Sequence, residues 1–150
     1  MAARLPRPPK PPRQRRDGRA VALLYAHEGA DVAIVYLPYE QPDAEETQRV
    51  VEEQGRTCLL LPGDLCDPDF CREVVAQTVR RFGRLNILAN NSDDHMPREG
   101  LADLGSEAPL DRPAQPEDIA PAYVYLASDA DSSSTVGEVI AVTGGIVDTR

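Results

Sequence analysis

The chain holds one lysine, Lys10, and it lies in a proline-rich stretch ahead of every segment that is predicted to fold. Five tyrosines carry exchangeable protons, but a phenol has a pKa of about 10 and needs a nearby cation to react near neutral pH. The three cysteines show no CxxC spacing, and His27 and His95 form no ligand-spaced cluster with them. The sequence therefore predicts no metal site and no lysine placed to activate a tyrosine.

Charge divides the chain into a basic start and an acidic remainder. The net charge is -9 over 150 residues, yet residues 1–19 carry seven basic side chains and a single acidic one. An acidic body argues against a nucleic-acid-binding domain, because phosphate contact needs a basic face. No apolar run is long enough to span a membrane. An odd number of cysteines without an apolar leader segment predicts reduced thiols and a cytoplasmic location.

Residues 1–17 are rich in proline and arginine. Repeated proline fixes φ and removes amide donors, so we expect a disordered or polyproline-II arm. The segment PRPPKPP could dock in an aromatic groove, and the arginines could touch an acidic surface. A solvated arm, or an aberrant start to the reading frame, explains the composition more simply, because composition is the only evidence for a binding role.

From Gly18 onward, apolar runs alternate between helical and strand spacing. We expect helices at residues 20–28, 43–53 (capped by Asp43), 68–82 (capped by Asp67 and ended by Gly83) and 116–128. Strands buried on both faces are expected at residues 31–37, 57–61, 85–89 and 136–142. This alternation predicts an α/β domain with a parallel sheet between two layers of helices, a three-layer sandwich over residues 18–150, with an irregular loop at residues 92–115.

Four blocks of sequence resemble the short-chain dehydrogenases/reductases (SDRs), and the glucose-1-dehydrogenase-like subgroup looks closest. They are GRAVALLYAHEGADVAIVYL, LLLPGDLCDPDFCREVV, GRLNILANN and PLDRPAQPEDIAPAYVYLASDADSSSTVGEVIAVTGG. The resemblance implies an incomplete, doubly wound Rossmann-like fold and an NAD(P)-dependent oxidoreduction of alcohols and carbonyls. It also implies subunit contacts through the C-terminal helix and strand, in a homo-oligomer or with a full-length SDR relative.

The resemblance assigns cofactor contacts to four residues. Gly18 matches the last glycine of the glycine-rich turn, Asp64 and Leu65 match the turn that receives the adenine, and Asn90 matches the first asparagine of the Asn-Asn-Ala-Gly motif. Asp64 could instead hydrogen-bond its own loop. At residues 36–37 Tyr-Leu replaces the aspartate that would bind a ribose hydroxyl, which leans toward NADP over NAD.

Two parts of the family pattern are missing. Residues 15–17 (Arg-Arg-Asp) stand where the glycine-rich turn should be, and only 23 residues separate Asn91 from Gln115, too few for two strand–helix units of about 30 residues each. In the family those units carry the catalytic serine and a tyrosine followed four residues later by lysine. No tyrosine here is followed at that spacing by a basic residue.

We therefore expect an inactive descendant of an oxidoreductase and assign no catalytic residue. It could bind nucleotide without catalysis, serve as a subunit, or come from a decayed or mispredicted reading frame. The missing strands also predict either a smaller sheet, in which the retained strands pair directly, or a marginally stable fold.

Overall fold

The structure is a computed structural model, and it describes residues 14–90, 109, 115–137 and 140–142. Its elements in chain order are α1 (Gln14–His27), β1 (Val32–Tyr36), the 3-10 helix η1 (Pro38–Glu40), α2 (Gln41–Glu52), β2 (Cys58–Pro62), α3 (Pro68–Phe82), α4 (Pro116–Ala127) and α5 (Asp129–Ser132). Helices alternate with parallel strands through α3, which confirms the predicted α/β class.

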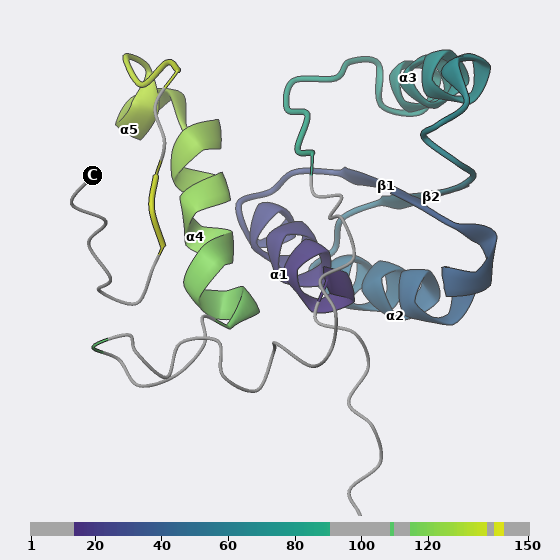
Figure 1. Cartoon of the computed structure of the whole chain (residues 1–150). Helices are drawn as coiled ribbons and strands as arrows, with labels where there is room; N and C mark the ends of the chain where they lie inside the picture. The colour runs from purple at the N-terminus through teal and green to yellow at the C-terminus, as the bar shows by residue number, and fades with distance from the viewer. Residues whose placement is uncertain (1–13, 91–108, 110–114, 138–139, 143–150) are drawn as a thin grey trace, which may run out of the picture.

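The sheet consists of two parallel strands, β1 and β2, with Val32 opposite Cys58 and Tyr36 opposite Pro62. The Val32 amide donates to the Thr57 carbonyl at 2.9 Å, and the Gly63 amide donates to the Tyr36 carbonyl at 2.9 Å. Helices α1 and α2 lie on one side of the strand pair and α3 lies on the other (Figure 1). The arrangement is therefore three-layered, with the strand pair between two layers of helices.

The core lies between the strand pair and the α1–α2 layer. Val51 of α2 has no exposed surface, and it packs with alanines 22 and 26 of α1 and with Val32 and Cys58 of the strands. The small alanine side chains let α1 approach the sheet closely. Helix α4 packs against α1, where the Tyr25 hydroxyl donates to the Tyr123 carbonyl at 3.2 Å (Figure 1).

Helix α3 begins and ends where the sequence predicts. The Asp67 side chain accepts a hydrogen bond from the Asp69 amide at 2.9 Å, which caps the helix, and Pro68 occupies its first turn. Gly83 ends the helix at φ 80°, a left-handed conformation that glycine adopts without a steric penalty.

Two helices begin earlier than expected. Helix α1 starts at Gln14, six residues before the predicted start and inside the segment expected to be an arm. Residues 14–17 contain no proline and two arginines, which favour helix once the proline run ends. Residues 38–42, between the first predicted strand and the second predicted helix, are helical, because η1 and the first turn of α2 fill them. Proline is tolerated at the start of a helix, so Pro42 lies in the first turn of α2 and Asp43 is not its cap.

Two predicted strands are not found among the residues that the structure describes. Residues 85–89 have no strand pairing and are exposed, with Leu88 at 78% exposure. The described part of the 136–142 segment is likewise not strand, and Val136 is 85% exposed. A parallel strand forms only beside a neighbour, and the neighbours of both segments belong to the missing units. Among the described residues the sheet has two strands, and the retained strands do not all pair within it.

The remaining predicted segments lie largely outside the described residues. These are residues 1–13 of the arm and all of the 92–115 loop except residues 109 and 115. Within the part of the chain that the structure describes, no helix is long and apolar enough to cross a membrane.

Candidate functional site

The candidate site lies at the carboxyl ends of the two strands. Because β1 and β2 are parallel, both chains leave the sheet at the same edge, and the hydrogen bond from Gly63 to the Tyr36 carbonyl extends the ladder one residue further. Open α/β sheets bind ligands at this edge. The turn formed by Asp64 and Leu65 follows β2 directly, so the structure places these two predicted residues where a nucleotide could approach.

Asp64 stabilises the turn that contains it. Its Oδ1 accepts a hydrogen bond from the Cys66 amide at 2.8 Å, and its carbonyl accepts one from the Asp67 amide at 3.1 Å. Asp64 therefore does hydrogen-bond its own loop, which was the alternative to a ligand role. It does not exclude the ligand role, because the residue is exposed. A carboxylate has about four acceptor positions, so a nucleotide donor can be added.

Leu65 offers an apolar surface beside that carboxylate. Its side chain is 49% exposed, and its carbonyl accepts a hydrogen bond from the Cys71 thiol at 3.2 Å. Side chains of this kind pack on the face of a purine, while a neighbouring acceptor takes the amino group. Asp64 and Leu65 together can therefore provide half of an adenine site, with polarity and apolar contact in adjacent residues.

Gly63 is a residue of the site that the sequence reasoning missed. A Cβ atom at this position would lie 2.3 Å from Cε2 and Cζ of Phe70, far inside van der Waals contact. The Phe70 ring, from the first turn of α3, thus lies directly against the backbone of the turn. The available signal was a glycine between a buried strand and an aspartate, which marks a close approach rather than a flexible joint.

The end of β1 is enclosed by polar groups of η1 and α2. The Tyr36 hydroxyl donates to Gln41 Oε1 at 2.5 Å, and the Leu37 amide donates to Glu40 Oε2 at 3.1 Å. Partial burial and the nearby charge of Glu45 raise the pKa of Tyr36, although the bond to Gln41 opposes the shift. Tyr36 therefore remains a neutral phenol at physiological pH and cannot act as a base there.

Gly18 lies inside α1 rather than at its start. Only the first four amides of a helix lack an intrahelical acceptor, and Gly18 is the fifth residue of α1. The amide groups that could receive a phosphate are therefore those of residues 14–17. Gly18 stays a predicted cofactor contact, but the helix geometry does not supply the free amide that this role would use.

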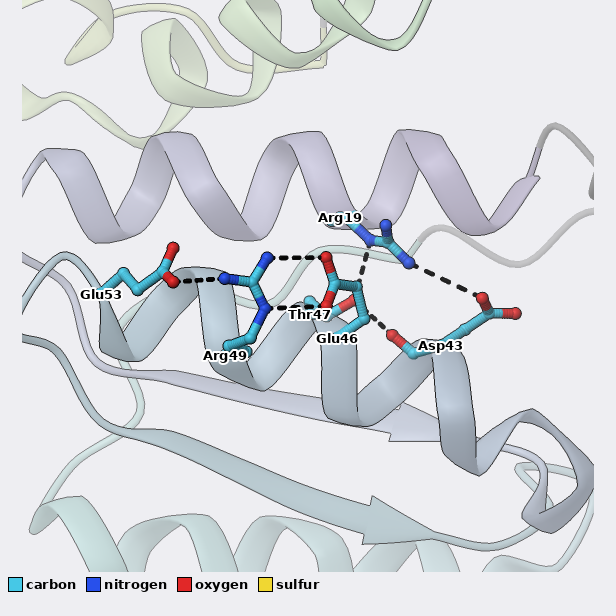
Figure 2. A network of polar contacts seen from close by, with 6 residues as sticks. All are labelled: Arg19, Asp43, Glu46, Thr47, Arg49 and Glu53. Atoms are coloured by element: carbon cyan, nitrogen blue, oxygen red, sulfur yellow. Dashed lines mark hydrogen bonds and ion pairs between the residues drawn. The ribbon is translucent and has the colours of Figure 1, made fainter.

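The side chain that follows Gly18 is already engaged. Arg19 Nε donates to Thr47 Oγ1 at 3.4 Å, and its guanidinium lies 3.7 Å from the Asp43 carboxylate (Figure 2). Thr47 in turn donates to the Asp43 carbonyl at 2.8 Å. These contacts join α1 to α2, and they direct Arg19 toward α2 rather than toward a bound phosphate.

The same network continues along the surface of α2. Arg49 bonds Glu46 at 2.8 Å and also bonds Glu53, one turn away on the other side (Figure 2). The hydrogen bond from Arg49 lowers the pKa of Glu46. These are exposed pairs at helical spacing that water and salt screen, so each contributes little to stability. Their role is structural.

Asn90 is not brought to the site. It is exposed and is the last residue of segment 84–90, which forms no strand. In a parallel sheet this segment would run beside the other strands and return the chain to their carboxyl edge. Because that strand is not formed, no strand pairing brings Asn90 beside Asp64, and of the four predicted residues only Asp64 and Leu65 lie in one turn.

No metal-ligating group of three or more side chains occurs among the described residues. An open groove of about 420 Å³ lies between β2 and α3, lined by Leu59, Glu73, Gln77, Arg80 and Arg81. It lies on the face of the sheet, away from the Asp64–Leu65 turn, and Arg80 is already bonded to Glu73 at 2.6 Å. The groove reflects incomplete packing of α3 on the sheet rather than a substrate site.

Comparison with known proteins identifies the family of the chain. The family model described as "Enoyl-(Acyl carrier protein) reductase" matches residues 18–93 and 92–147. "General stress protein 39" of Bacillus subtilis (strain 168) is 50% identical over 90 residues, and the alignment covers 60% of this chain and 31% of the relative. "Uncharacterized oxidoreductase YghA" of Escherichia coli (strain K12) is 47% identical over 90 residues, with coverage of 60% and 31%.

Among solved structures, the acetoin dehydrogenase from Enterobacter cloacae matches 78% of this chain and 45% of its own, at 25% identity and a TM-score of 0.47. For the two curated relatives named above, the aligned part of this chain spans about a third of the relative's length. The family model, by contrast, covers nearly all of the chain from Gly18 onward. The chain belongs to the short-chain dehydrogenase/reductase family, in the branch described as enoyl-(acyl carrier protein) reductase.

Proposed function

We propose that the chain binds the adenosine half of NAD(P) at the Asp64–Leu65 turn and transfers no hydride by itself. The observation that carries the proposal is the combination of an ordered adenine-side turn at the carboxyl edge of β2 with the absence of any lysine after residue 10. The Asp64–Leu65 turn retains one part of the family's cofactor site. The absence of a lysine after residue 10 means that a catalytic tyrosine would lack the cation it requires.

The environments of the tyrosines support the inactive half of the proposal. Burial raises the pKa of Tyr25, and the neighbouring Tyr123 adds to the shift, while burial and Glu45 raise that of Tyr36. A general acid or base works best when its pKa is near the operating pH, so these shifts go in the wrong direction. Neither of these phenols is suited to exchange a proton with a carbinol.

The two matched segments of the family model support an internal deletion. They meet at residues 92–93. The predicted position of the missing strand–helix units, after Asn91, falls at this junction. These units carry the catalytic serine and the Tyr-x-x-x-Lys pair in the family, so we propose that the truncation removed the catalytic centre.

Charge around the end of β1 favours NAD over NADP in this proposal. The carboxylates of Glu40 and Glu45 lie near Tyr36 and Leu37, where the family places the ribose of the adenosine. A 2′-phosphate would bring about two negative charges to a region that already holds two carboxylates. The replacement of the ribose-binding aspartate pointed weakly to NADP, and the surrounding charge opposes that preference.

Isothermal titration with NADH, NADPH and ADP-ribose tests the binding half. We expect saturable binding of ADP-ribose near a Kd of about 1 mM, since only half of the site is present. Asp64→Asn should weaken it roughly tenfold, because a hydrogen bond to a charged acceptor contributes about 1.5–3 kcal/mol. Asp69→Asn is the matched control, as an exposed carboxylate on the first turn of α3 that should leave binding unchanged.

No heat of binding up to several millimolar ADP-ribose would refute the nucleotide site, and equal weakening by both variants would show a general charge effect. The catalytic half has its own assay. Purified chain incubated with NAD(P)H and a panel of aldehydes and ketones should show no oxidation of the cofactor above that of an Asp64→Asn sample. Reproducible turnover that follows the protein through purification would overturn the proposal of inactivity.

A second candidate function is that of a subunit, in a homo-oligomer or with a full-length SDR relative. The even-numbered residues of β1 form the backbone hydrogen bonds with β2. The amides and carbonyls of Ala33 and Val35 therefore point to the opposite edge of β1, where no strand pairs among the described residues. An open apolar edge of this kind accepts a further strand. Light scattering after gel filtration tests it: association that Val35→Pro abolishes would support this role, and a monomer at every concentration would exclude self-association.

The free cysteines fit the proposed cytoplasmic location.

A further inference from the structure

Cys66 and Cys71 occupy a specific pair of positions at the start of α3. Asp67 is the cap of this helix, so Cys66 immediately precedes the cap and Cys71 is the fourth helical residue. Apolar side chains at these two positions often pack against each other across the first turn, an arrangement known as the hydrophobic staple. Here cysteines occupy both positions.

Each thiol-bearing residue also contacts the turn that precedes the helix. The Cys71 thiol donates to the Leu65 carbonyl at 3.2 Å, and the Cys66 amide donates to Asp64 Oδ1 at 2.8 Å. Cys66 is exposed and Cys71 is half-buried, so an external reagent can reach the pair. The third cysteine, Cys58, is buried in the core and lies outside this arrangement.

We propose that Cys66 and Cys71 form a reversible intramolecular disulfide that clamps the Asp64–Leu65 turn to the first turn of α3. The reaction needs an oxidant, for which a small disulfide such as glutathione disulfide suffices. The Cys66 thiolate attacks the small disulfide, forming a mixed disulfide and releasing one thiol. The Cys71 thiolate then attacks Cys66 Sγ and releases the second thiol. Two cysteine thiols lose two electrons and two protons, and one small disulfide is reduced to two thiols.

Local charge sets the rate at which the pair reacts. The hydrogen bond to Asp64, its charge, burial and the neighbouring Cys71 thiol together raise the pKa of Cys66, so its thiolate is scarce at neutral pH. Oxidation is therefore best measured at mildly alkaline pH, where more thiolate is present. Cys58 remains protected under those conditions, because burial and the nearby Glu52 raise its pKa to about 11.

Intact-mass spectrometry of the native chain, incubated with glutathione disulfide and then alkylated, tests the proposal. We expect most chains to lose two hydrogen atoms in mass, to stay monomeric on a non-reducing gel and to retain one alkylated cysteine. The Asp-N protease cleaves before Asp67 and Asp69, between the two cysteines. The peptides that carry Cys66 and Cys71 should therefore stay linked until a reductant is added.

Serine variants assign the bond. Cys58→Ser should still lose two hydrogen atoms, whereas Cys66→Ser and Cys71→Ser should not. A mixed disulfide that persists on Cys66, a cross-linked dimer, or a bond that involves Cys58 would each overturn the proposal. This test does not depend on nucleotide binding, so failure of the proposed ligand site and failure of the proposed disulfide are distinguishable. Retained circular dichroism of the variants excludes unfolding as the cause of any difference.

Discussion

Replacement of Gly63 by alanine tests whether the close contact with Phe70 defines the turn. The new Cβ would lie 2.3 Å from Cε2 and Cζ of the ring, so either the ring or the turn has to move. Overpacking of this kind destabilises by about 1–3 kcal/mol, and Phe70 is only half-buried, so part of the strain can be relieved by rotation of the ring. The contribution from the clash is therefore expected near the lower end of that range.

A second contribution has the opposite sign. The φ of Gly63 lies outside the left-handed region, so alanine can adopt the backbone conformation, and the loss of unfolded-state entropy stabilises by about 0.4–1 kcal/mol. Subtracted from a clash cost of about 1 kcal/mol, it leaves a net loss of about 0.5 kcal/mol. For a chain of this size that lowers the Tm by about 1–2 °C. Thermal unfolding followed by circular dichroism at 222 nm measures it directly.

The Phe70→Leu background isolates the contact. Without the ring, only the entropic contribution of Gly63→Ala remains, so the same substitution should become stabilising by about 0.5 kcal/mol, a reversal of sign. Gly83→Ala is the matched control, since Gly83 has open space but a φ of 80°. Its loss should be the same in both backgrounds. If Gly63→Ala raises the Tm of the unmodified chain, the packing argument is wrong.

Three further predictions concern the cap, the core and a buried thiol. Asp67→Ala removes the cap of α3 and should destabilise by about 1 kcal/mol, seen as a lower denaturation midpoint in urea, whereas Asp67→Asn should retain most of the stability. Val51→Ala should cost about 2 kcal/mol in the same assay, because Val51 has no exposed surface and its loss leaves a cavity. The free energy of unfolding should fall as pH rises from 9.0 toward 11, because the unfolded state releases the Cys58 proton while the folded state, in which the Cys58 pKa is raised to about 11, retains it. Cys58→Ser should flatten this part of the pH profile of stability. A profile unchanged by the substitution would contradict the assignment to Cys58.

The helices could be predicted from the sequence because their signals are local. Asp67, Pro68 and Gly83 define the two ends of α3 through contacts within a few residues, and the structure reproduces each of them. The prediction failed at the start of α1, because the non-helical arm expected from the repeated prolines was extended to residue 17. Residues 14–17 follow the last proline of the arm, and nothing in them opposes a helix.

The strands could be predicted only in part because a strand depends on partners that are distant in sequence. Residues 32–36 and 58–62 are apolar and pair with each other. Residues 85–89 are equally apolar but remain unpaired. Periodicity describes what a segment can bury, and it contains no information on whether a neighbouring strand is present to accept its hydrogen bonds.

The predicted site residues also divide into those placed by nearby segments and those that depend on distant strands. Asp64 and Leu65 depend on the end of a single strand and the start of the following helix, and the structure places them together. Gly18 and Asn90 depend on a strand that precedes α1 and on a strand at residues 85–89, and neither residue has the geometry that its predicted role needs. The contact between Gly63 and Phe70 was not predictable from spacing, because it requires the position of a ring in three dimensions.

The groove beside α3 and the exposed segment after it have one physical cause. In a right-handed crossover, the helix is held against the sheet by the strands at both of its ends. Here α3 is tied to the sheet only through β2, since residues 85–89 add no strand after Gly83. The valines 75 and 79 of α3 consequently remain 45% and 41% exposed, although their spacing marks them for burial. A disulfide from Cys71 to Cys66 would strengthen this single connection at its N-terminal end, next to the turn where we propose that the nucleotide binds.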